Sequence, residues 1–336
     1  QALRGKIILI DFWTYTCVNC VRTIPYLKQW NDKYADKGLV IVGIHSPEFG
    51  FERDKENVIY AVEKYGINYA IGQDNNLATW DIFSNMYWPA KYLIDKDGYV
   101  RYTHFGEGAY IETEEKIREL LKEAQHDIST IAVGTDVGPK LDPSVVNSPP
   151  GQGQTRDLFT GVEHNYSAIA MGLSEGSGGV APYIAIEEYY KKPNTDIMYE
   201  DTDEHVNHFI YLQGLWHNNV ESLSHARETK NYEDYLAVKF HGTEMNVVMG
   251  TDDGTKDKVQ ITIDDRPLKP TEAGSDILFD ESGNSYVIVE KSDMYRIVNL
   301  PKFANHEVKI LCNGATLHVF AFTFGSYVRD SNWEQK

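Results

Sequence analysis

Two cysteines, Cys17 and Cys20, are separated by two residues and lie between an apolar run and an amphipathic helical pattern. The apolar run, residues 6–13, predicts a buried strand, and the helical pattern begins at Val18. A strand that leads into a helix N-terminus places Cys17 beside unpaired backbone N–H groups, which favour an anion. A thiolate at Cys17 can attack a disulfide, and Cys20, one turn further along, is the expected buried resolving thiol.

Zinc binding and a purely structural disulfide are the alternatives for this cysteine pair. Zinc needs about four ligands, and neither a second Cys-x-x-Cys nor a close histidine pair follows, so we predict no metal site. The motif and its position between strand and helix favour redox chemistry. Cys312 ends an alternating apolar run, and we expect it to be a buried, inert thiol of a strand.

Asp11 is a carboxylate inside the apolar run, six residues before Cys17. An isolated buried carboxylate is costly unless it has a partner or a role. We therefore interpret Asp11 as the group that takes the proton of Cys20 when this thiol resolves a mixed disulfide. Pro25 falls inside the helix that follows the cysteines and predicts a kink there.

The pattern Asp-Phe-Trp-x-x-x-Cys-x-x-Cys, with a proline eight residues after the first cysteine, resembles the thioredoxin fold. The longer stretch 11–27 resembles the redoxin part of DipZ-type proteins. This resemblance implies an extracytoplasmic thiol–disulfide oxidoreductase, membrane-tethered in its full-length form and acting on protein disulfides. It also implies a CcdA/DsbD-like membrane electron carrier on the same full-length chain, and no cofactor besides the Cys17–Cys20 disulfide.

The order of elements expected in the first 126 residues agrees with this resemblance. Strands are predicted at 6–13, 39–45, 88–95 and 99–105, and helices at 18–37, 51–65, 75–84 and 112–124. This is the thioredoxin order with the additional middle helix of the TlpA-like branch. Residues 1–126 are therefore expected to form an α/β thioredoxin-like redox domain.

The resemblance also assigns residues around the cysteines. The proline that precedes the third strand, Pro89, is expected to be cis and to face the cysteines across a substrate groove; an ordinary trans proline is the alternative. Trp13, Tyr15 and Trp88 are expected to line this groove, although Trp88 packing on Trp13 or Tyr15 is also compatible with the sequence. Glu48 is expected near the cysteines, with a solvated loop carboxylate as the alternative.

Length and charge set further limits. A chain of 336 residues suggests two domains. Of the formal net charge of −18, residues 1–126 carry −3 and the remainder −15, which argues against binding to nucleic acid or an anionic membrane. No run reaches transmembrane length and no signal peptide is visible, and we expect the chain to be an excised part of a longer protein.

The second half follows a different pattern. Residues 127–155 are rich in proline and glycine and are expected to be a linker. Residues 156–336 contain short alternating runs of β-branched and aromatic residues, which predict an all-β sandwich with no helix after Gln125. Residues 215–217, 264–268 and 319–325 resemble the C-terminal part of DipZ-type proteins, a jelly-roll related to carbohydrate-binding modules.

Two functional hypotheses follow. The first is a thiol–disulfide oxidoreductase that relays electrons from the membrane carrier to extracytoplasmic protein disulfides, with cytochrome c maturation as a candidate pathway. The second is an envelope glycan-binding or docking module, with the redoxin half regulatory or scaffolding. Aromatic residues of the β domain could stack on sugar rings, or could simply belong to its core. The candidates for sugar binding are Tyr183, Tyr189, Tyr190, Trp216 and Tyr232.

Overall fold

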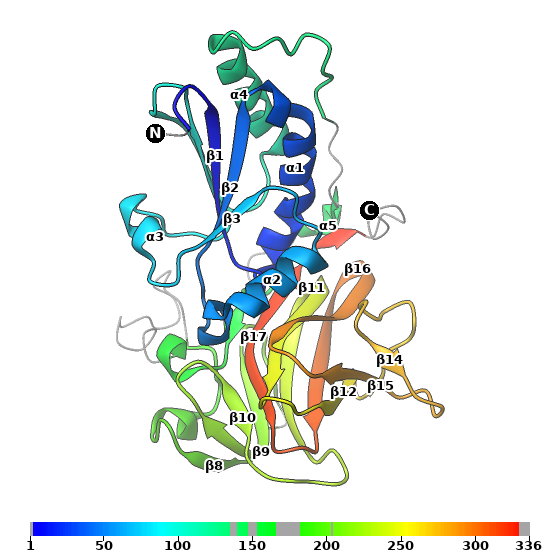
Figure 1. Ribbon diagram of the computed structural model, residues 1–336. Helices are drawn as coiled ribbons and strands as arrows, with labels where there is room; N and C mark the ends of the chain where they lie inside the picture. The colour runs from blue at the N-terminus through cyan, green and yellow to red at the C-terminus, as the bar shows by residue number, and fades with distance from the viewer. Residues whose placement is uncertain (1–2, 135–139, 147–152, 166–181, 203, 329–336) are drawn as a thin grey trace. The chain divides into compact units, whose positions relative to one another are not determined.

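A computed structural model of the chain divides into two units, residues 1–138 and 139–336. This division falls within the predicted linker (Figure 1). The structure describes residues 3–134, 140–146, 153–165, 182–202 and 204–328.

The first unit contains a five-stranded sheet in the order β3-β2-β1-β4-β5. Strands β1, β2 and β3 are parallel to one another, whereas β4 runs antiparallel to both β1 and β5. This is the predicted thioredoxin-like arrangement. Its strands are β1 (Ile7–Trp13), β2 (Leu39–His45), β3 (Ala70–Gln73), β4 (Ala90–Ile94) and β5 (Val100–Phe105).

Four α-helices accompany this sheet: α1 (Val18–Tyr34), α2 (Lys55–Lys64), α3 (Ala78–Ile82) and α4 (Tyr110–Glu123). The first helix continues as a 3₁₀ turn, Ala35–Lys37, and ends at Gly38, which adopts a φ of 97°. The helix predicted over 51–65 is divided, because Asp54 caps α2 by accepting a hydrogen bond from the Glu56 N–H at 2.8 Å. A separate 3₁₀ turn, Gly50–Arg53, precedes it.

Helices α1 and α4 pack on the same face of the sheet. The core there is built from alternate residues of β1, including Ile7 and Leu9, and from Leu27 of α1 and Leu121 of α4. Because side chains alternate along a strand, Asp11 belongs to this same face, at its end nearest the start of α1. The opposite face packs Phe12 against aromatic residues of and beside α3.

The first residues of the predicted linker belong to the first unit. Ile128 is 2% exposed and lies in the core formed with α1 and α4. The backbone N–H of Gly134 donates to Glu114 Oε2 at 2.8 Å, and Glu114 also accepts a hydrogen bond from the Tyr34 hydroxyl at 2.7 Å. These contacts hold the segment after α4 against the redox domain.

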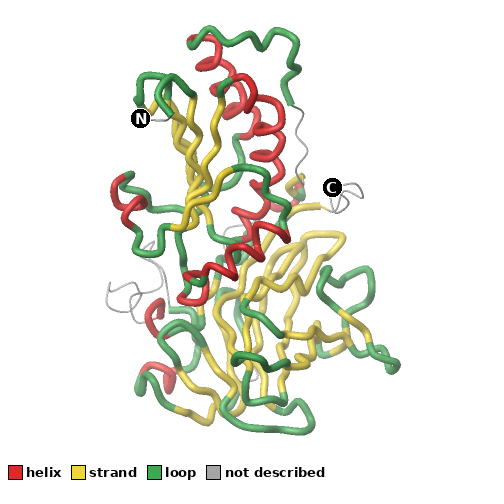
Figure 2. The backbone as a smooth tube through the Cα atoms, in the orientation of Figure 1, coloured by secondary structure: helices red, strands yellow, loops and turns green. Residues whose placement is uncertain are grey.

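The second unit consists mainly of strands, as Figure 2 shows, and its long strands pair antiparallel. Eleven strands form one hydrogen-bonded network, in which β14-β15-β12-β16-β11-β17-β10-β9-β8 is the main path, with β13 beside β12 and β7 beside β17. A separate pair joins β6 (Lys140–Leu141) to β18 (Tyr327–Val328). The strands of the network are β7 (Leu158–Phe159), β8 (Asp196–Tyr199), β9 (Ile210–Asn218), β10 (Leu223–His225), β11 (Asp234–Thr251), β12 (Asp257–Ile263), β13 (Arg266–Pro267), β14 (Leu278–Phe279), β15 (Ser285–Val289), β16 (Asp293–Cys312) and β17 (Leu317–Gly325).

Two long strands, β11 and β16, each join runs that the sequence pattern separates. An irregularity in register after Gly242 lets β11 continue instead of ending in a turn. Its first part pairs with β9 over 235–238, and its second part pairs with β17 over 244–251. The all-β prediction is confirmed, and its strands are longer and more continuous than expected.

The prediction that no helix follows Gln125 was wrong. The short helix α5 (Pro143–Val146) begins with proline, which suits a first helical position. Asp142 precedes it and accepts hydrogen bonds from the N–H and the hydroxyl of Ser144. Residues 162–165 are also helical, and Glu187–Tyr190 forms a 3₁₀ turn.

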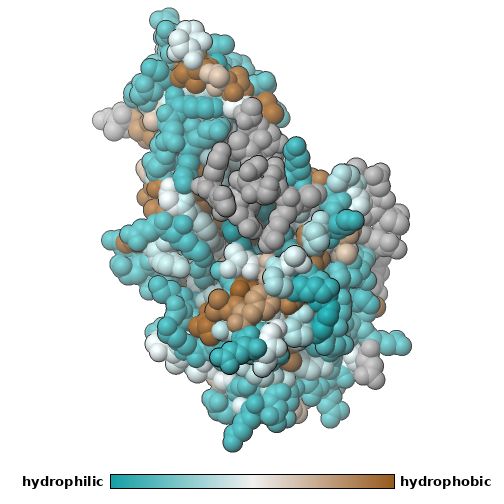
Figure 3. Space-filling view, turned by 90° about the vertical axis from the view of Figure 1, so that its right-hand side faces the viewer, coloured by the Kyte–Doolittle hydropathy of each residue, from teal (hydrophilic) through white to brown (hydrophobic). Residues whose placement is uncertain are grey.

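The face drawn in Figure 3 is largely hydrophilic, with hydrophobic residues gathered in a few patches. In the part of the chain that the structure describes, no helix is both long and apolar enough to cross a membrane.

Candidate active site

Cys17 lies at the N-cap of α1, as predicted, and its backbone is extended. Its Sγ accepts a hydrogen bond from the Cys20 backbone N–H at 3.3 Å, so a helix N-terminus stabilises negative charge on this sulfur. Cys17 is half-buried and Cys20 is 1% exposed. The two Sγ atoms lie 2.6 Å apart, which places the buried thiol directly behind the accessible one.

Burial raises the pKa of Cys20 well above its usual value, and the hydrogen bond to the Cys17 sulfur raises it further. A thiol of this kind is a poor nucleophile until a base removes its proton. The arrangement therefore separates the two roles: Cys17 is available to attack, and Cys20 needs an acceptor for its proton.

Asp11 meets the expectation of a buried carboxylate near the cysteines. Its side chain is 2% exposed, and burial raises its pKa to about 7, against the opposing attraction of Lys91. The negative charge of Asp11 contributes to the raised pKa of Cys20, so the two groups lie close enough to interact. A carboxyl with a pKa near 7 is well matched to proton transfer at neutral pH.

The Trp88–Pro89 peptide bond is cis, as the resemblance implies. The carbonyl of Pro89 accepts a hydrogen bond from the Gly106 N–H at 2.8 Å, which fixes this turn to the end of β5. The indole N–H of Trp88 donates to the Ser46 carbonyl at 3.0 Å, and its ring lies 4.2 Å from that of Trp80. Trp88 and Cys17 pack as partly buried residues against one apolar cluster.

That cluster contains Trp13 and Tyr15. The prediction that these two side chains line the substrate groove was wrong. Both side chains are 1% exposed, and their rings pack against His45 with centroid distances of 5.2 and 5.6 Å. Both side chains support the segment before Cys17 from the interior of the domain. The alternative for Trp88, packing against the Trp13 and Tyr15 cluster, is the one the structure supports.

Exposed aromatic rings do lie beside Pro89, but they come from residues that the sequence patterns did not single out. Tyr87 is 51% and Phe105 47% exposed, and their ring centroids are 5.3 Å apart. Phe105 pairs with Ala90, the residue that follows Pro89. The position of Tyr87 immediately before the Trp-Pro pair is a local sequence signal that could have indicated it.

The carboxylate that organises the loop after β2 is Glu52 rather than Glu48. Glu48 is half-buried, whereas Glu52 is fully buried. Glu52 accepts hydrogen bonds from the Thr16 hydroxyl at 2.6 Å and from the backbone N–H groups of Glu48 and Phe49 at 2.6 and 3.1 Å. Since Thr16 directly precedes Cys17, Glu52 ties this loop to the cysteine segment; its pKa is raised by burial.

Two further expectations concern the second unit. Cys312 is fully buried, as predicted, and burial raises its pKa. Trp216 and Tyr189 are also fully buried in the β core, so neither can stack on a sugar. Their burial follows from the alternation of β9 and from packing against the core, and the prediction that they bind carbohydrate was wrong.

The remaining three candidates are half-buried. The Tyr190 hydroxyl donates to the Ile184 carbonyl at 2.8 Å, and Tyr183 lies under the guanidinium of Arg156 at 4.6 Å. Tyr232 adopts a φ of 53° in the turn before β11. These contacts are those of residues that stabilise the β unit.

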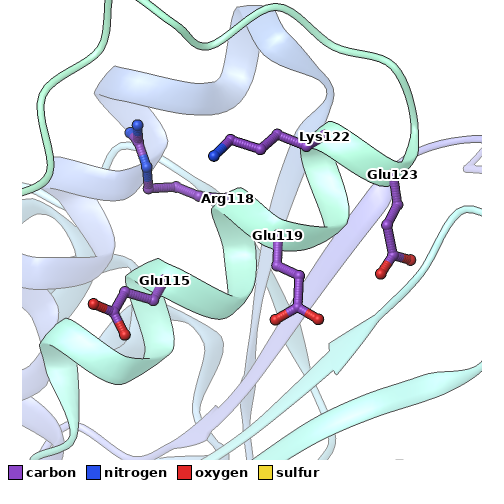
Figure 4. A pocket seen from close by; sticks show the side chains of 5 residues that line it. All are labelled: Glu115, Arg118, Glu119, Lys122 and Glu123. Atoms are coloured by element: carbon purple, nitrogen blue, oxygen red, sulfur yellow. The ribbon is translucent and has the colours of Figure 1, made fainter.

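An open depression on the exposed surface of α4 is lined by charged side chains of both signs, as Figure 4 shows. Arg118 donates from here to the Tyr34 hydroxyl at 2.8 Å. Neither a cysteine nor an aromatic residue lines the depression. Its lining residues are Glu115, Arg118, Glu119, Lys122 and Glu123.

Comparison with known proteins agrees with this geometry. A family model described as "Thioredoxin-like" matches residues 5–100, and one described as "Thioredoxin like C-terminal domain" matches residues 183–325. Protein DipZ of Mycobacterium tuberculosis is 44% identical over 149 residues, which cover 44% of this chain and 21% of that protein. The chain thus spans about a fifth of the length of this relative.

Thiol-disulfide oxidoreductase YkuV of Bacillus subtilis is 30% identical over 125 residues, covering 37% of this chain and 84% of YkuV. Among solved structures, a thioredoxin-like protein in its oxidized form has 30% identity and a TM-score of 0.33, covering 35% of this chain and 79% of that one.

Proposed function

Because the chain belongs to the thioredoxin-like thiol-disulfide oxidoreductases, we propose that its first unit exchanges thiols and disulfides with protein substrates. The observation that carries this proposal is the half-buried Cys17 at the N-cap of α1, with the buried Cys20 thiol 2.6 Å behind it.

The reaction begins with attack of the Cys17 thiolate on one sulfur of a substrate disulfide. A bond forms between Cys17 and this sulfur, and the other substrate sulfur leaves as a thiolate. Asp11 then accepts the proton of the Cys20 thiol. The Cys20 thiolate attacks Cys17, which forms the Cys17–Cys20 disulfide and releases the second substrate thiolate. Two electrons have moved from the cysteine pair to the substrate.

Different residues around the cysteines contribute to the reactivity of Cys17 and to the binding of the substrate. The Cys20 backbone N–H at the helix N-terminus donates a hydrogen bond to the Cys17 sulfur, which positions this sulfur for attack. The cis-Pro89 turn and the exposed rings of Tyr87 and Phe105 offer a surface for the substrate backbone and its apolar side chains. The cysteine pair stores the electrons itself, so this chemistry requires no metal or organic cofactor.

For the longer protein we propose a reductase on the outer face of a membrane. The likeness to DipZ supports a CcdA/DsbD-like membrane electron carrier on the same full-length chain, which would reduce the Cys17–Cys20 disulfide after each turnover. Protein disulfides outside the cytoplasm would then be the substrates, and cytochrome c maturation is one pathway that requires such a reductant.

Trapping of the mixed disulfide tests the proposal. In Cys20→Ser the second step is blocked, so a peptide or protein disulfide should remain linked to Cys17 and should be identified by mass spectrometry. The matched control, Cys17→Ser with Cys20→Ser, should trap nothing, although Cys312 is still present. A substrate found on Cys312, or no adduct in Cys20→Ser, would contradict the proposal.

A further inference from the structure

Asp11 is one member of a row of residues that crosses the whole sheet of the first unit. The strand register pairs Ile71 with Gly43, Gly43 with Asp11, Asp11 with Lys91, and Lys91 with His104. Side chains directly opposite each other share a face, with Cβ atoms about 4.5–5.5 Å apart in antiparallel pairs. The row therefore places three titratable side chains, Asp11, Lys91 and His104, next to one another on β1, β4 and β5.

Lys91 is a rare kind of lysine. It is fully buried, and among the residues that the structure describes its Nζ has no hydrogen-bond partner. Its Nζ lies 5.8 Å from the ring centroid of Tyr110. Oδ1 of Asp11 is likewise buried and without a partner there. Buried polar groups without partners are costly and call for a functional explanation.

The row leads from the interior to the edge of the sheet. Asp11 and Lys91 are buried, whereas His104 is half-buried and lies on the edge strand β5. Its Nε2 is 3.3 Å from the carbonyl oxygen of Glu107. His104 is therefore the member of the row that lies nearest to solvent.

Several ionisable groups of the first unit act on the three titratable side chains of this row. Lys91 is attracted by Asp11, Cys20, Glu107 and Cys17, and Glu107 in turn lies 3.5 Å from Arg22. Asp11 also influences the hydroxyl of Tyr69. The charges that act on His104 are those of Lys91 and Glu112.

Burial makes the pKa values of the buried carboxyl and the buried amine of the row more similar. It raises the pKa of Asp11 to about 7, lowers the pKa of Lys91, and lowers the pKa of His104, on which Lys91 acts in the same direction. A carboxyl and an amine that differ greatly in water thus become groups between which a proton can move with a smaller change in free energy.

We propose that Lys91 and His104 form a relay that carries the proton taken from Cys20 by Asp11 out to solvent. This inference rests on the proposed function. The Cys20 S–H bond breaks and its proton binds Asp11. Lys91 transfers a proton to His104 and then accepts the proton held by Asp11. His104 releases its proton to water. One proton leaves the protein for each Cys17–Cys20 bond formed, and the relay itself is neither oxidised nor reduced.

The relay differs from a simpler role in which Lys91 only moderates the charge of Asp11. Loss of Lys91 removes the attraction that lowers the pKa of Asp11, so both roles predict a higher pH midpoint for the resolving step in Lys91→Met. Only the relay predicts that the rate stays low above this new midpoint, and only the relay requires His104.

The test follows the two steps separately by rapid mixing of the reduced protein with a disulfide-containing peptide in dilute buffer. Lys91→Met and His104→Ala should keep the rate of attack by Cys17 and should lower the rate of resolution by about tenfold or more. Added imidazole should restore resolution in His104→Ala. The control is Lys96→Met, which removes an exposed lysine in the turn after β4 and should change neither step.

Two results would overturn the relay: resolution at the wild-type rate in His104→Ala, or full recovery of the rate at high pH in Lys91→Met. If Lys91→Met does not fold, His104→Ala decides, because this residue is half-buried at an edge strand. Failure of the wild type to form any mixed disulfide at Cys17 would instead refute the proposed function.

Discussion

Asp11 and Lys91 lie directly opposite each other on β1 and β4, and both are buried on the face of the sheet covered by α1 and α4. Their opposite charges attract, yet burial has the larger effect on the pKa of Asp11. The pair therefore holds a carboxyl that exchanges protons near neutral pH beneath the resolving cysteine.

The first prediction concerns the pH dependence of resolution. Only the ionised form of Asp11 can accept a proton, and its pKa is about 7. The rate at which Cys20 resolves the mixed disulfide should therefore rise with pH and level off above about pH 8. In Asp11→Asn this rise should vanish and the rate should fall about 100-fold, whereas attack by Cys17 is unaffected. Equal slowing of both steps would contradict the role of Asp11.

The second prediction concerns stability. The pKa of Asp11 in the folded protein is raised from 3.8 to about 7. Between these two pH values the folded state therefore binds more protons than the unfolded state. Stability contributed by the protonated carboxyl is therefore complete below pH 3.8 and is lost as pH rises through 7. Asp11→Asn should raise the free energy of unfolding at pH 8 by up to roughly 4 kcal/mol, and by little near pH 4.

Asp95→Asn is the control for this experiment, because we expect its effect on stability at pH 8 to have the opposite sign. Asp95 accepts hydrogen bonds from the backbone N–H groups of Tyr99 and Asp97, and these lower its pKa. Its contribution is present at neutral pH and is lost on acidification. Denaturant titrations should thus show Asp95→Asn less stable than the wild type at pH 8. A stability difference for Asp11→Asn that does not change with pH would refute the assignment.

The third prediction concerns thiol reactivity. Cys17 is half-buried, whereas Cys20 and Cys312 are buried and burial raises the pKa of both. Iodoacetamide at pH 7 should therefore modify Cys17 first in the folded, reduced protein, and peptide mapping by mass spectrometry should identify the site. Faster modification of Cys20 or Cys312 would show that the accessible thiol has been assigned wrongly.

The fourth prediction concerns the exposed aromatic residues beside Pro89. Tyr87→Ala and Phe105→Ala should raise KM for a protein disulfide about fivefold, because such contacts contribute about 1 kcal/mol. Turnover of a small aromatic disulfide should not change, since it contacts only the cysteines. Tyr99→Ala is the matched control, because Tyr99 is 71% exposed and does not lie beside Pro89 in the sequence. Equal effects on both substrates would exclude a docking role.

Local sequence patterns were sufficient for the central features of the first unit. The apolar run, the cysteine spacing and the isolated Asp11 predicted a strand, a helix N-terminus and a buried carboxyl, because each depends on neighbours within a few residues. Glu52 could not be distinguished from Glu48 in this way. Its burial depends on a hydrogen bond to Thr16, 36 residues away in the sequence.

The register between neighbouring strands was the main structural feature that could not be predicted from the sequence. Lys91 was included in a predicted strand, but its position opposite Asp11 depends on how β1 and β4 align. The buried places of Trp13 and Trp216 likewise depend on which face of a strand meets a helix or the β core. An aromatic residue at such a position satisfies the pattern of a core and that of a binding platform equally well.

The measurement that tests the central claim most directly is reduction of insulin disulfides with dithiothreitol as the electron donor. The wild type should accelerate the reduction, Cys17→Ser should abolish the acceleration, and Cys312→Ser should leave it intact. Acceleration that persists in Cys17→Ser, or that is lost in Cys312→Ser, would contradict the account of Cys17 as the nucleophile of a thiol–disulfide oxidoreductase.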